Sequence, residues 1–192
     1  NVIIENGGNK LKLHSALSAN VDIFGADKSD LIHLDGCWGR ERFVNREPIV
    51  SGNKFVESRV GASSSYHNPF IAVANSTATE NEGDVYGFNF VYSGNFIAGT
   101  EINPYGCLRI YMGLNPNEFE WVLENGENFV TPEVILTYSS DGLSGMSRIY
   151  HKLIRSRLCR GKYRDTERFA LINNWEATYF DFNEDKIVEI AK

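Results

Sequence analysis

The sequence predicts a mainly β protein: a large antiparallel sandwich or barrel-like double sheet, followed by a connecting helix and the start of an α/β unit. Three observations predict this fold class. Residues 1–140 consist of short apolar runs, and residues typical of turns separate these runs from one another. Helical spacing of apolar residues appears only after Asp141. Residues 169–192 then contain one strand pattern, a polar loop and a helical start.

The first half of this region predicts a series of strands. Residues 2–5 form a short apolar run before an Asn-Gly-Gly-Asn turn. In residues 11–23 apolar side chains occupy most odd positions, which is the period of a strand with one face on a core. Further strands are expected at 30–35, 42–50 and 54–60, with a turn at Ser51-Gly52-Asn53 between the last two.

The second half contains a continuous apolar strand and a hairpin signal. Residues 70–74 are apolar throughout, and a polar loop separates them from 85–92. The tight turn Ser93-Gly94-Asn95 then leads into 96–102, and this pattern predicts a hairpin. The remaining strands are expected at 107–112, around the alternating Phe119, Trp121 and Leu123, and at 134–138.

The end of the chain predicts a helix and one βα unit. A helix is expected from Asp141 to about Arg160, with Gly161 as its stop and its terminal cations facing water. A buried parallel strand at 169–172 and a helix capped by Asn183 follow. One such unit cannot cover both faces of its strand, so the chain is expected to be part of a longer protein or to pack on a neighbour. The predicted domains are 1–140, 141–168 and 169–192.

Composition argues against several function classes. The net charge of −6 does not suit a nucleic-acid binder. No apolar run approaches the roughly 20 residues that span a bilayer. The cysteines form no CxxC pair and predict free thiols in a reducing cytoplasm, and the histidines match no zinc spacing, so no metal or cofactor is expected. These residues are Cys37, Cys107, Cys159, His14, His33, His67 and His151.

Two tryptophan motifs are candidate functional sites. Trp38 lies between Gly36 and Gly39 in a charged neighbourhood. It is either a core plug at a strand end or an exposed platform on which a sugar ring stacks. Trp175 follows Asn174 at the expected C-terminal end of a parallel strand, where α/β proteins bind ligands.

The remaining candidates have weaker signals. Glu176 and Asp181 are either catalytic carboxylates or structural hydrogen-bond acceptors, and the second role is favoured because their mutual placement is unknown. The hydroxyl-rich run 59–70 contains neither a nucleophile elbow nor a phosphate-binding loop, so it predicts a packed turn.

Five motifs occur in order along nearly the whole chain. They are GCWGRERFV (36–44), SRVGASSSYHNPF (58–70), GDVYGFNFVYSGNF (83–96), TPEVILTYSSDGLSGMS (131–147) and LINNWEATYFDFNE (171–184). Together they closely resemble the α-galactosidases of glycoside hydrolase family 36. The resemblance implies an N-terminal β-supersandwich without its first strands, a connecting helix, and the first strand and helix start of a (β/α)₈ catalytic barrel.

The same resemblance implies an activity that this chain cannot perform alone. The family hydrolyses α-1,6-linked galactose from melibiose, raffinose and related galactosides with retention, using two aspartates on later barrel strands. No residue of this chain matches either aspartate, so Glu176 and Asp181 are excluded as catalysts. The chain is expected to be an inactive part of a cytoplasmic enzyme that assembles as a homotetramer.

Two substrate-binding residues follow from the resemblance. Trp175 matches a Trp on the first barrel strand that lines the galactose pocket. Trp38 matches a sandwich Trp that reaches the active site of a neighbouring subunit, and so acts in trans. Cys37 departs from the small residue expected beside it, which alters local packing but not the platform. The alternatives are a non-catalytic carbohydrate-binding or assembly module, and a parent enzyme for α-N-acetylgalactosaminides or galactosyl transfer.

Overall fold

The structure, a computed structural model, describes residues 1–24 and 28–192. The chain forms two compact units, Asn1–His151 and Lys152–Lys192. Strands β1–β13 belong to the first unit, and short helices make up the ordered elements of the second. The two units are therefore different kinds of structure, and each has its own packing.

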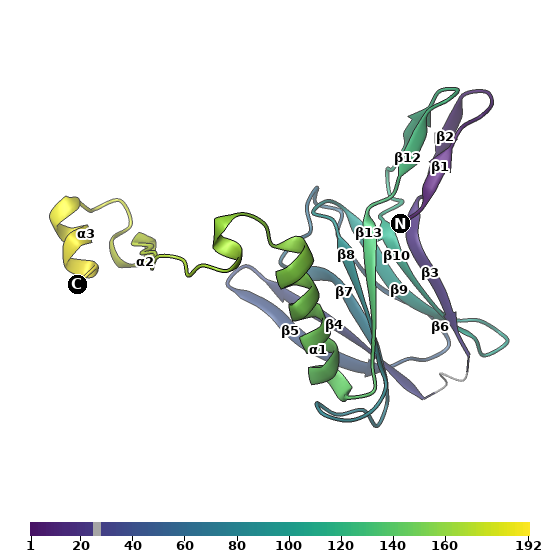
Figure 1. Cartoon of the computed structure of the whole chain (residues 1–192), viewed down its shortest axis with the longest axis horizontal. Coiled ribbons are helices and arrows are strands. Elements are labelled where there is room, and N and C mark those ends of the chain that lie inside the picture. The colour runs from purple at the N-terminus through teal and green to yellow at the C-terminus, as the bar shows by residue number, and fades with distance from the viewer. Residues whose placement is uncertain (25–27) are drawn as a thin grey trace. The chain divides into compact units, whose positions relative to one another are not determined.

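Two antiparallel sheets form the body of the first unit (Figure 1). The five-stranded sheet has the order β13-β8-β7-β4-β5, and the four-stranded sheet has the order β3-β10-β9-β6. The strands of the first sheet are β4 (Ser29–Cys37), β5 (Arg40–Pro48), β7 (His67–Asn75), β8 (Val85–Val91) and β13 (Glu133–Ser139). Those of the second are β3 (Leu17–Ile23), β6 (Gly52–Glu57), β9 (Phe96–Ile102) and β10 (Leu108–Leu114).

The main core lies between these two sheets. Alternate residues of each strand point into it, which is the side-chain period of a pleated sheet with one face on the interior. This packing confirms the predicted mainly β, antiparallel sandwich architecture. The most buried members include Leu31, Ile71 and Phe88 from the five-stranded sheet and Phe96, Ile110 and Met112 from the four-stranded sheet.

Helix α1 (Gly142–Leu153) covers the outer face of the five-stranded sheet (Figure 1). Met146 and Tyr150 pack there against Ala72 and Val85. The Tyr150 hydroxyl donates to the Ile135 carbonyl at 3.2 Å, and burial raises the pKa of Tyr150 to about 12. Because the middle strands are covered on both faces, they need apolar side chains on both, which explains the continuous apolar run at 70–74.

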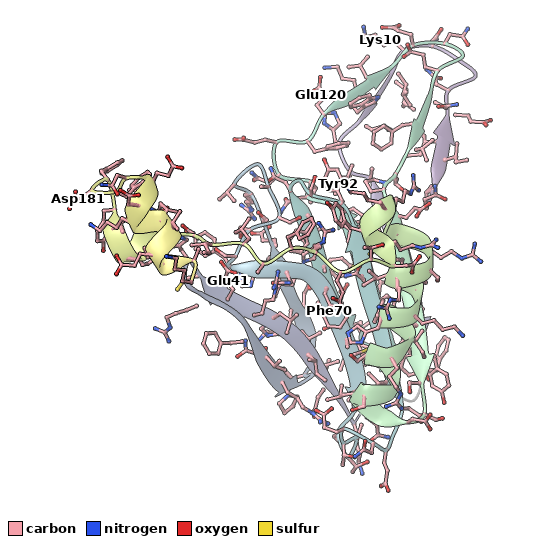
Figure 2. All side chains as sticks on the ribbon, turned by 60° about the vertical axis from the view of Figure 1, so that its left-hand side comes forward. Lys10, Glu41, Phe70, Tyr92, Glu120 and Asp181 are labelled. Carbon is pink, nitrogen blue, oxygen red and sulfur yellow. The ribbon has the colours of Figure 1, made fainter. Side chains whose placement is uncertain are left out.

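A narrow arm of four short strands extends from the sandwich (Figure 1). Strand β1 (Ile3–Glu5) pairs with β12 (Asn128–Val130), and β2 (Leu11–Leu13) pairs with β11 (Trp121–Leu123). Figure 2 labels Lys10 and Glu120 on this arm. Exposed ion pairs join its two sides, from Lys10 to Glu124 at 2.7 Å and from Lys12 to Glu120 at 3.0 Å.

Three strand predictions are corrected by this topology. The predicted hairpin between 85–92 and 96–102 is wrong, because β8 pairs with β7 and β13 whereas β9 pairs with β6 and β10. The turn at 93–95 carries the chain from one sheet to the other, so that Phe90 and Phe96 both enter the core. The single strand expected at 11–23 is two strands with a bend between them, and β12 was not predicted.

The second unit contains short helical segments. The helix predicted from Asp141 is present, but α1 gives way to a π-helical turn at Ile154–Leu158, and Gly161 follows with a left-handed φ of 77°. A 3₁₀ turn at Lys162–Arg164, α2 (Trp175–Thr178) and α3 (Glu184–Ile190) complete the unit. No helix in the described ranges has both the length and the apolar character needed to cross a bilayer.

The cap of α3 is confirmed, but the strand expected before α2 is absent. The Asn183 side chain accepts a hydrogen bond from the Lys186 amide at 2.9 Å, as an N-cap does. Residues 169–172 adopt no strand, and Phe169 and Leu171 are 91% and 88% exposed. A strand needs a neighbour to receive its backbone hydrogen bonds, and residues 169–172 pair with no strand of the described chain.

Candidate functional site

Trp38 lies at the tip of the hairpin that joins β4 to β5. Its side chain is 88% exposed, and the following Gly39 has a left-handed φ of 73° that suits a tight turn. This exposure excludes the alternative that Trp38 is a core plug of this chain. An aromatic ring held in solvent at a hairpin tip is available as a stacking platform.

The hairpin is distorted just below its tip. Asp35 pairs with Phe43 and Cys37 pairs with Arg40, so two residues of β5 face the single residue Gly36. One of the two, Arg42, has a φ of 61°, which is uncommon for a residue with a side chain. This two-against-one arrangement is a β-bulge, and bulges bend a strand and redirect the side chains beyond it.

Gly36 is required by the same bulge. A Cβ at this position would lie 2.3 Å from the Arg40 carbonyl oxygen and 2.7 Å from the Glu41 Cα. Both are backbone atoms, so neither can move without moving the hairpin. Gly36 therefore permits the close crossing of the two strands immediately before Trp38.

The ladder between β4 and β7 is also irregular at this level. His33 pairs with Ile71, but the next pair is Asp35 with His67, so β7 has extra residues between these two pairs. Pro69 lies among them and has no N–H to donate to a ladder. Beyond this point, the Gly36 amide still donates to the Tyr66 carbonyl at 3.0 Å.

A chain of ionisable side chains occupies the root of the hairpin. Asp35 Oδ1 lies 2.8 Å from His33 Nδ1 and 2.8 Å from His67 Nδ1. The other ring nitrogen of the buried His33 lies 2.6 Å from Glu47 Oε1, and Lys54 of β6 donates to the second oxygen of Glu47. We call these five residues the hairpin-root network.

The network favours ionised carboxylates. Burial works to raise the pKa of Asp35, but hydrogen bonds from His33 and His67 outweigh it and hold that pKa below its usual value. The hydrogen bond from Lys54, and then that from His33, lowers the pKa of Glu47. His33 has a carboxylate opposite each ring nitrogen and can donate to both only as the doubly protonated ring.

A polar groove lies beside this hairpin. It has a volume of about 290 Å³ and is lined by Glu41, Arg42, Ser63, Ser64, Ser65, Asn68 and Pro69. The hydroxyl-rich run is largely tied into its own turn: Ser63 Oγ donates to the Tyr92 carbonyl at 3.1 Å, and Ser64 Oγ accepts from the Tyr66 amide at 3.1 Å. These bonds confirm the predicted packed turn.

Trp175, in the second unit, is the first residue of α2 and is 45% exposed. Its ring packs edge-on against Tyr179 and Phe180, with centroid distances of 5.5 and 4.9 Å. Its amide donates to Asn173 Oδ1 at 3.1 Å. The aromatic loop therefore holds itself together through local contacts. Trp38 and Trp175 belong to different units, and each site is defined within its own unit.

The two carboxylates near Trp175 lie on the surface. Glu176 is exposed in the first turn of α2, where a negative charge suits the helix N-terminus. Asp181 is exposed and lies 3.4 Å from Lys186 Nζ, which also donates to the Asp181 backbone carbonyl at 2.8 Å. The contact of Asp181 with Lys186 fits the structural role that the sequence favoured.

Sequence reasoning missed the hairpin-root network. His33 and His67 were considered only as zinc ligands, although among the described residues no group of His, Cys, Asp and Glu is arranged to hold a metal ion. One signal was available: His33 and Asp35 are two residues apart in a strand and so share one face. The convergence of His67 from β7 and Glu47 from β5 required the sheet order.

An antiparallel double sheet that presents an aromatic ring at a hairpin tip, followed by a second aromatic loop, has features of a carbohydrate-contacting protein. The Glycosyl hydrolase family 36 N-terminal domain matches residues 1–124, and Melibiase matches residues 128–192. The chain belongs to glycosyl hydrolase family 36.

Several characterised proteins are similar over almost the entire chain. The α-galactosidase AgaA of Geobacillus stearothermophilus is 58% identical over 97% of this chain and 25% of its own length. Mel36A of Lactobacillus acidophilus is 41% identical over 97% of this chain and 25% of its own length. A crystal structure of an AgaA variant in complex with raffinose matches with a TM-score of 0.93 at 57% identity, covering 98% of this chain and 26% of that one. The chain thus spans about a quarter of these relatives.

Proposed function

We propose that this chain is the sandwich and barrel-entry part of a retaining α-galactosidase that releases terminal α-1,6-linked galactose from melibiose- and raffinose-type oligosaccharides. The 58% identity to an α-galactosidase along 97% of the chain is the observation that carries the proposal. The raffinose complex of a closely similar protein supports the substrate class. The catalytic aspartates belong to the barrel beyond this chain, so residues 1–192 alone are inactive.

Trp38 and Trp175 are the substrate-binding residues of this chain in the proposal. Trp175 lines the galactose pocket from the segment that begins the barrel, and 45% of its surface is exposed in this chain. Trp38 acts in trans, as a wall of the active site of a neighbouring subunit. Its exposure supports this role, because a ring that is 88% exposed in its own chain is free to contact another one.

The proposed assembly and location follow from the same features. A wall supplied in trans requires an oligomer, and we infer a homotetramer. We propose the domains 1–140 as the sandwich, 141–168 as the connector and 169–192 as the start of the barrel. Cys37 and Cys159 are exposed free thiols, which supports a reducing, cytoplasmic location.

The activity is tested on the longer enzyme that contains this chain, by measuring galactose release from raffinose and the anomeric configuration of the first product. Release of α-galactose supports the proposal. Inversion, or no release, contradicts it. Hydrolysis by residues 1–192 alone would show that the catalysts are not in the missing barrel.

The role of Trp38 is tested by Trp38→Ala in the same enzyme. Loss of one stacking ring is expected to raise KM for raffinose about tenfold, with little change in kcat. Trp38→Phe keeps an aromatic face and is expected to retain most of the affinity. Tyr105→Ala removes another exposed aromatic ring, from the turn between β9 and β10, and serves as the matched control. Equal KM values for the Trp38→Ala and Tyr105→Ala enzymes would contradict the role.

A further inference from the structure

We propose that Asp35 is the positioning residue of the Trp38 hairpin, and that it acts by fixing the hairpin root to β7 through His33 and His67. The expected effect of Asp35 on KM rests on the proposed function, because that function has Trp38 contact the substrate. The dependence of the order of the hairpin tip on the Asp35 carboxylate does not rest on that function.

The backbone alone leaves the hairpin weakly specified at this level. The β4–β5 ladder shifts register between Asp35 and Cys37, and the β4–β7 ladder shifts between His33 and Asp35. A regular ladder fixes the orientation of a strand through evenly repeated hydrogen bonds. Here both ladders of β4 are interrupted within five residues of Trp38. Beyond the β4–β7 irregularity the backbone contributes the Gly36–Tyr66 hydrogen bond, and side-chain contacts add to it in holding the root.

The Asp35 carboxylate provides such side-chain contacts. One oxygen, Oδ1, accepts from His33 on its own strand and from His67 on β7, each at 2.8 Å. The bond to His67 connects residues 32 positions apart, across the irregular part of the ladder. Charge-assisted bonds of this kind are shorter and stronger than neutral ones, and they restrict geometry.

The rest of the network keeps His33 in place. Its second nitrogen lies 2.6 Å from Glu47 on β5, and Glu47 is bound in turn by Lys54 on β6 of the opposite sheet. Asp35 is therefore held by a chain of contacts that includes both strands flanking β4 and reaches the second sheet. Trp38, three residues further on, is almost free of contacts of its own.

The test is a double-mutant cycle in the longer enzyme, with Asp35→Asn, Trp38→Ala and the double variant. Asparagine keeps the size of the side chain but removes its charge. If Asp35 acts through Trp38, Asp35→Asn raises KM for raffinose about three- to tenfold with kcat nearly unchanged. In the Trp38→Ala background, the same substitution causes no further rise in KM. An equal effect of Asp35→Asn in both backgrounds overturns the proposal. An unchanged KM for Asp35→Asn also overturns it if Trp38→Ala by itself raises KM.

A second measurement examines the hairpin directly in the 192-residue chain. Backbone ¹⁵N relaxation is expected to show lower order parameters for residues 36–40 in Asp35→Asn than in the unsubstituted chain. Unchanged order parameters overturn the proposal. If Trp38→Ala leaves KM unchanged while Asp35→Asn mobilises the tip, the proposed substrate role of Trp38 fails and the positioning by Asp35 stands.

His67 provides variants in case Asp35→Asn does not fold. The His67 side chain is 34% exposed, so it tolerates substitution better than a core residue does. His67→Gln keeps a donor toward Asp35, whereas His67→Leu does not. His67→Leu is expected to mobilise residues 36–40, and His67→Gln to preserve their order. Asp22→Asn is the matched control, because Asp22 forms an exposed ion pair with Arg109 on β3 and β10. Equal mobility in all three variants overturns the proposal.

Discussion

The two units of this chain use similar side chains in opposite ways. In the sandwich, Ile71, Phe96 and Ile110 are completely buried between two sheets. In Lys152–Lys192, which the structure describes throughout, Thr178 is the one buried residue. Phe169, Leu171 and Phe180 of that unit are as apolar as the core residues of the sandwich but remain largely exposed.

The difference shows that apolar composition makes a core only where a second layer is present. The sandwich supplies both layers from one chain, because the chain passes several times between the two sheets. In addition, α1 covers the outer face of the five-stranded sheet. The second unit has short helices and one segment, 169–172, whose sequence predicts a strand but which forms none. A lone βα unit has nothing to cover such a strand. Its apolar residues are suited to neighbours from a barrel, as the proposed function requires.

Hydrogen exchange should give the largest contrast between the two units. Amides of β7, which is paired on both sides, are expected to exchange about a thousandfold or more slowly than those of residues 169–172, which pair with no described strand. The measurement is amide exchange followed by mass spectrometry on the 192-residue chain. Similar protection of both segments would mean that 169–172 has found a partner strand.

Truncation of one apolar side chain in each unit should give the next largest contrast. Ile71→Ala leaves a cavity in the core between the sheets and is expected to reduce the free energy of unfolding by about 2–5 kcal/mol. Leu171→Ala removes an exposed side chain and is expected to change it by less than about 0.5 kcal/mol. Urea titration of both variants tests this, and comparable losses would contradict the comparison.

The smallest effect concerns acid stability. The pKa values of Asp35 and Glu47 are lowered in the folded chain, so their contribution is present above about pH 4 and is lost as the pH falls through the lowered values. Replacing both by Asn and Gln should flatten the acid limb of the unfolding free energy. Glu120→Gln, which breaks an exposed pair with Lys12, should flatten it less. Unfolding titrations between pH 2 and 7 compare the variants, and an equal change in slope would contradict the distinction between partly buried and exposed pairs.

Local patterns predicted the elements of the sandwich well. Strands β4 to β10 and β13 lie at or within a few residues of the expected positions, because period-two alternation and turn residues act over a few neighbours. The cap of α3 by Asn183 was predictable for the same reason. The exception at 169–172 is instructive: its apolar pattern is that of a buried strand, but pairing is not a local property.

Sequence by itself determined the mainly β class, most strand positions, the aromatic candidates Trp38 and Trp175, and the family resemblance, since these depend on residue identity and short-range order. Only the tertiary structure decided that β8 and β9 lie in different sheets, that Trp38 is exposed rather than buried, and that His33, Asp35, Glu47, Lys54 and His67 meet at one hairpin root. The physical reason is that sheet order and side-chain convergence are set by packing between residues far apart in the chain, which no local pattern records.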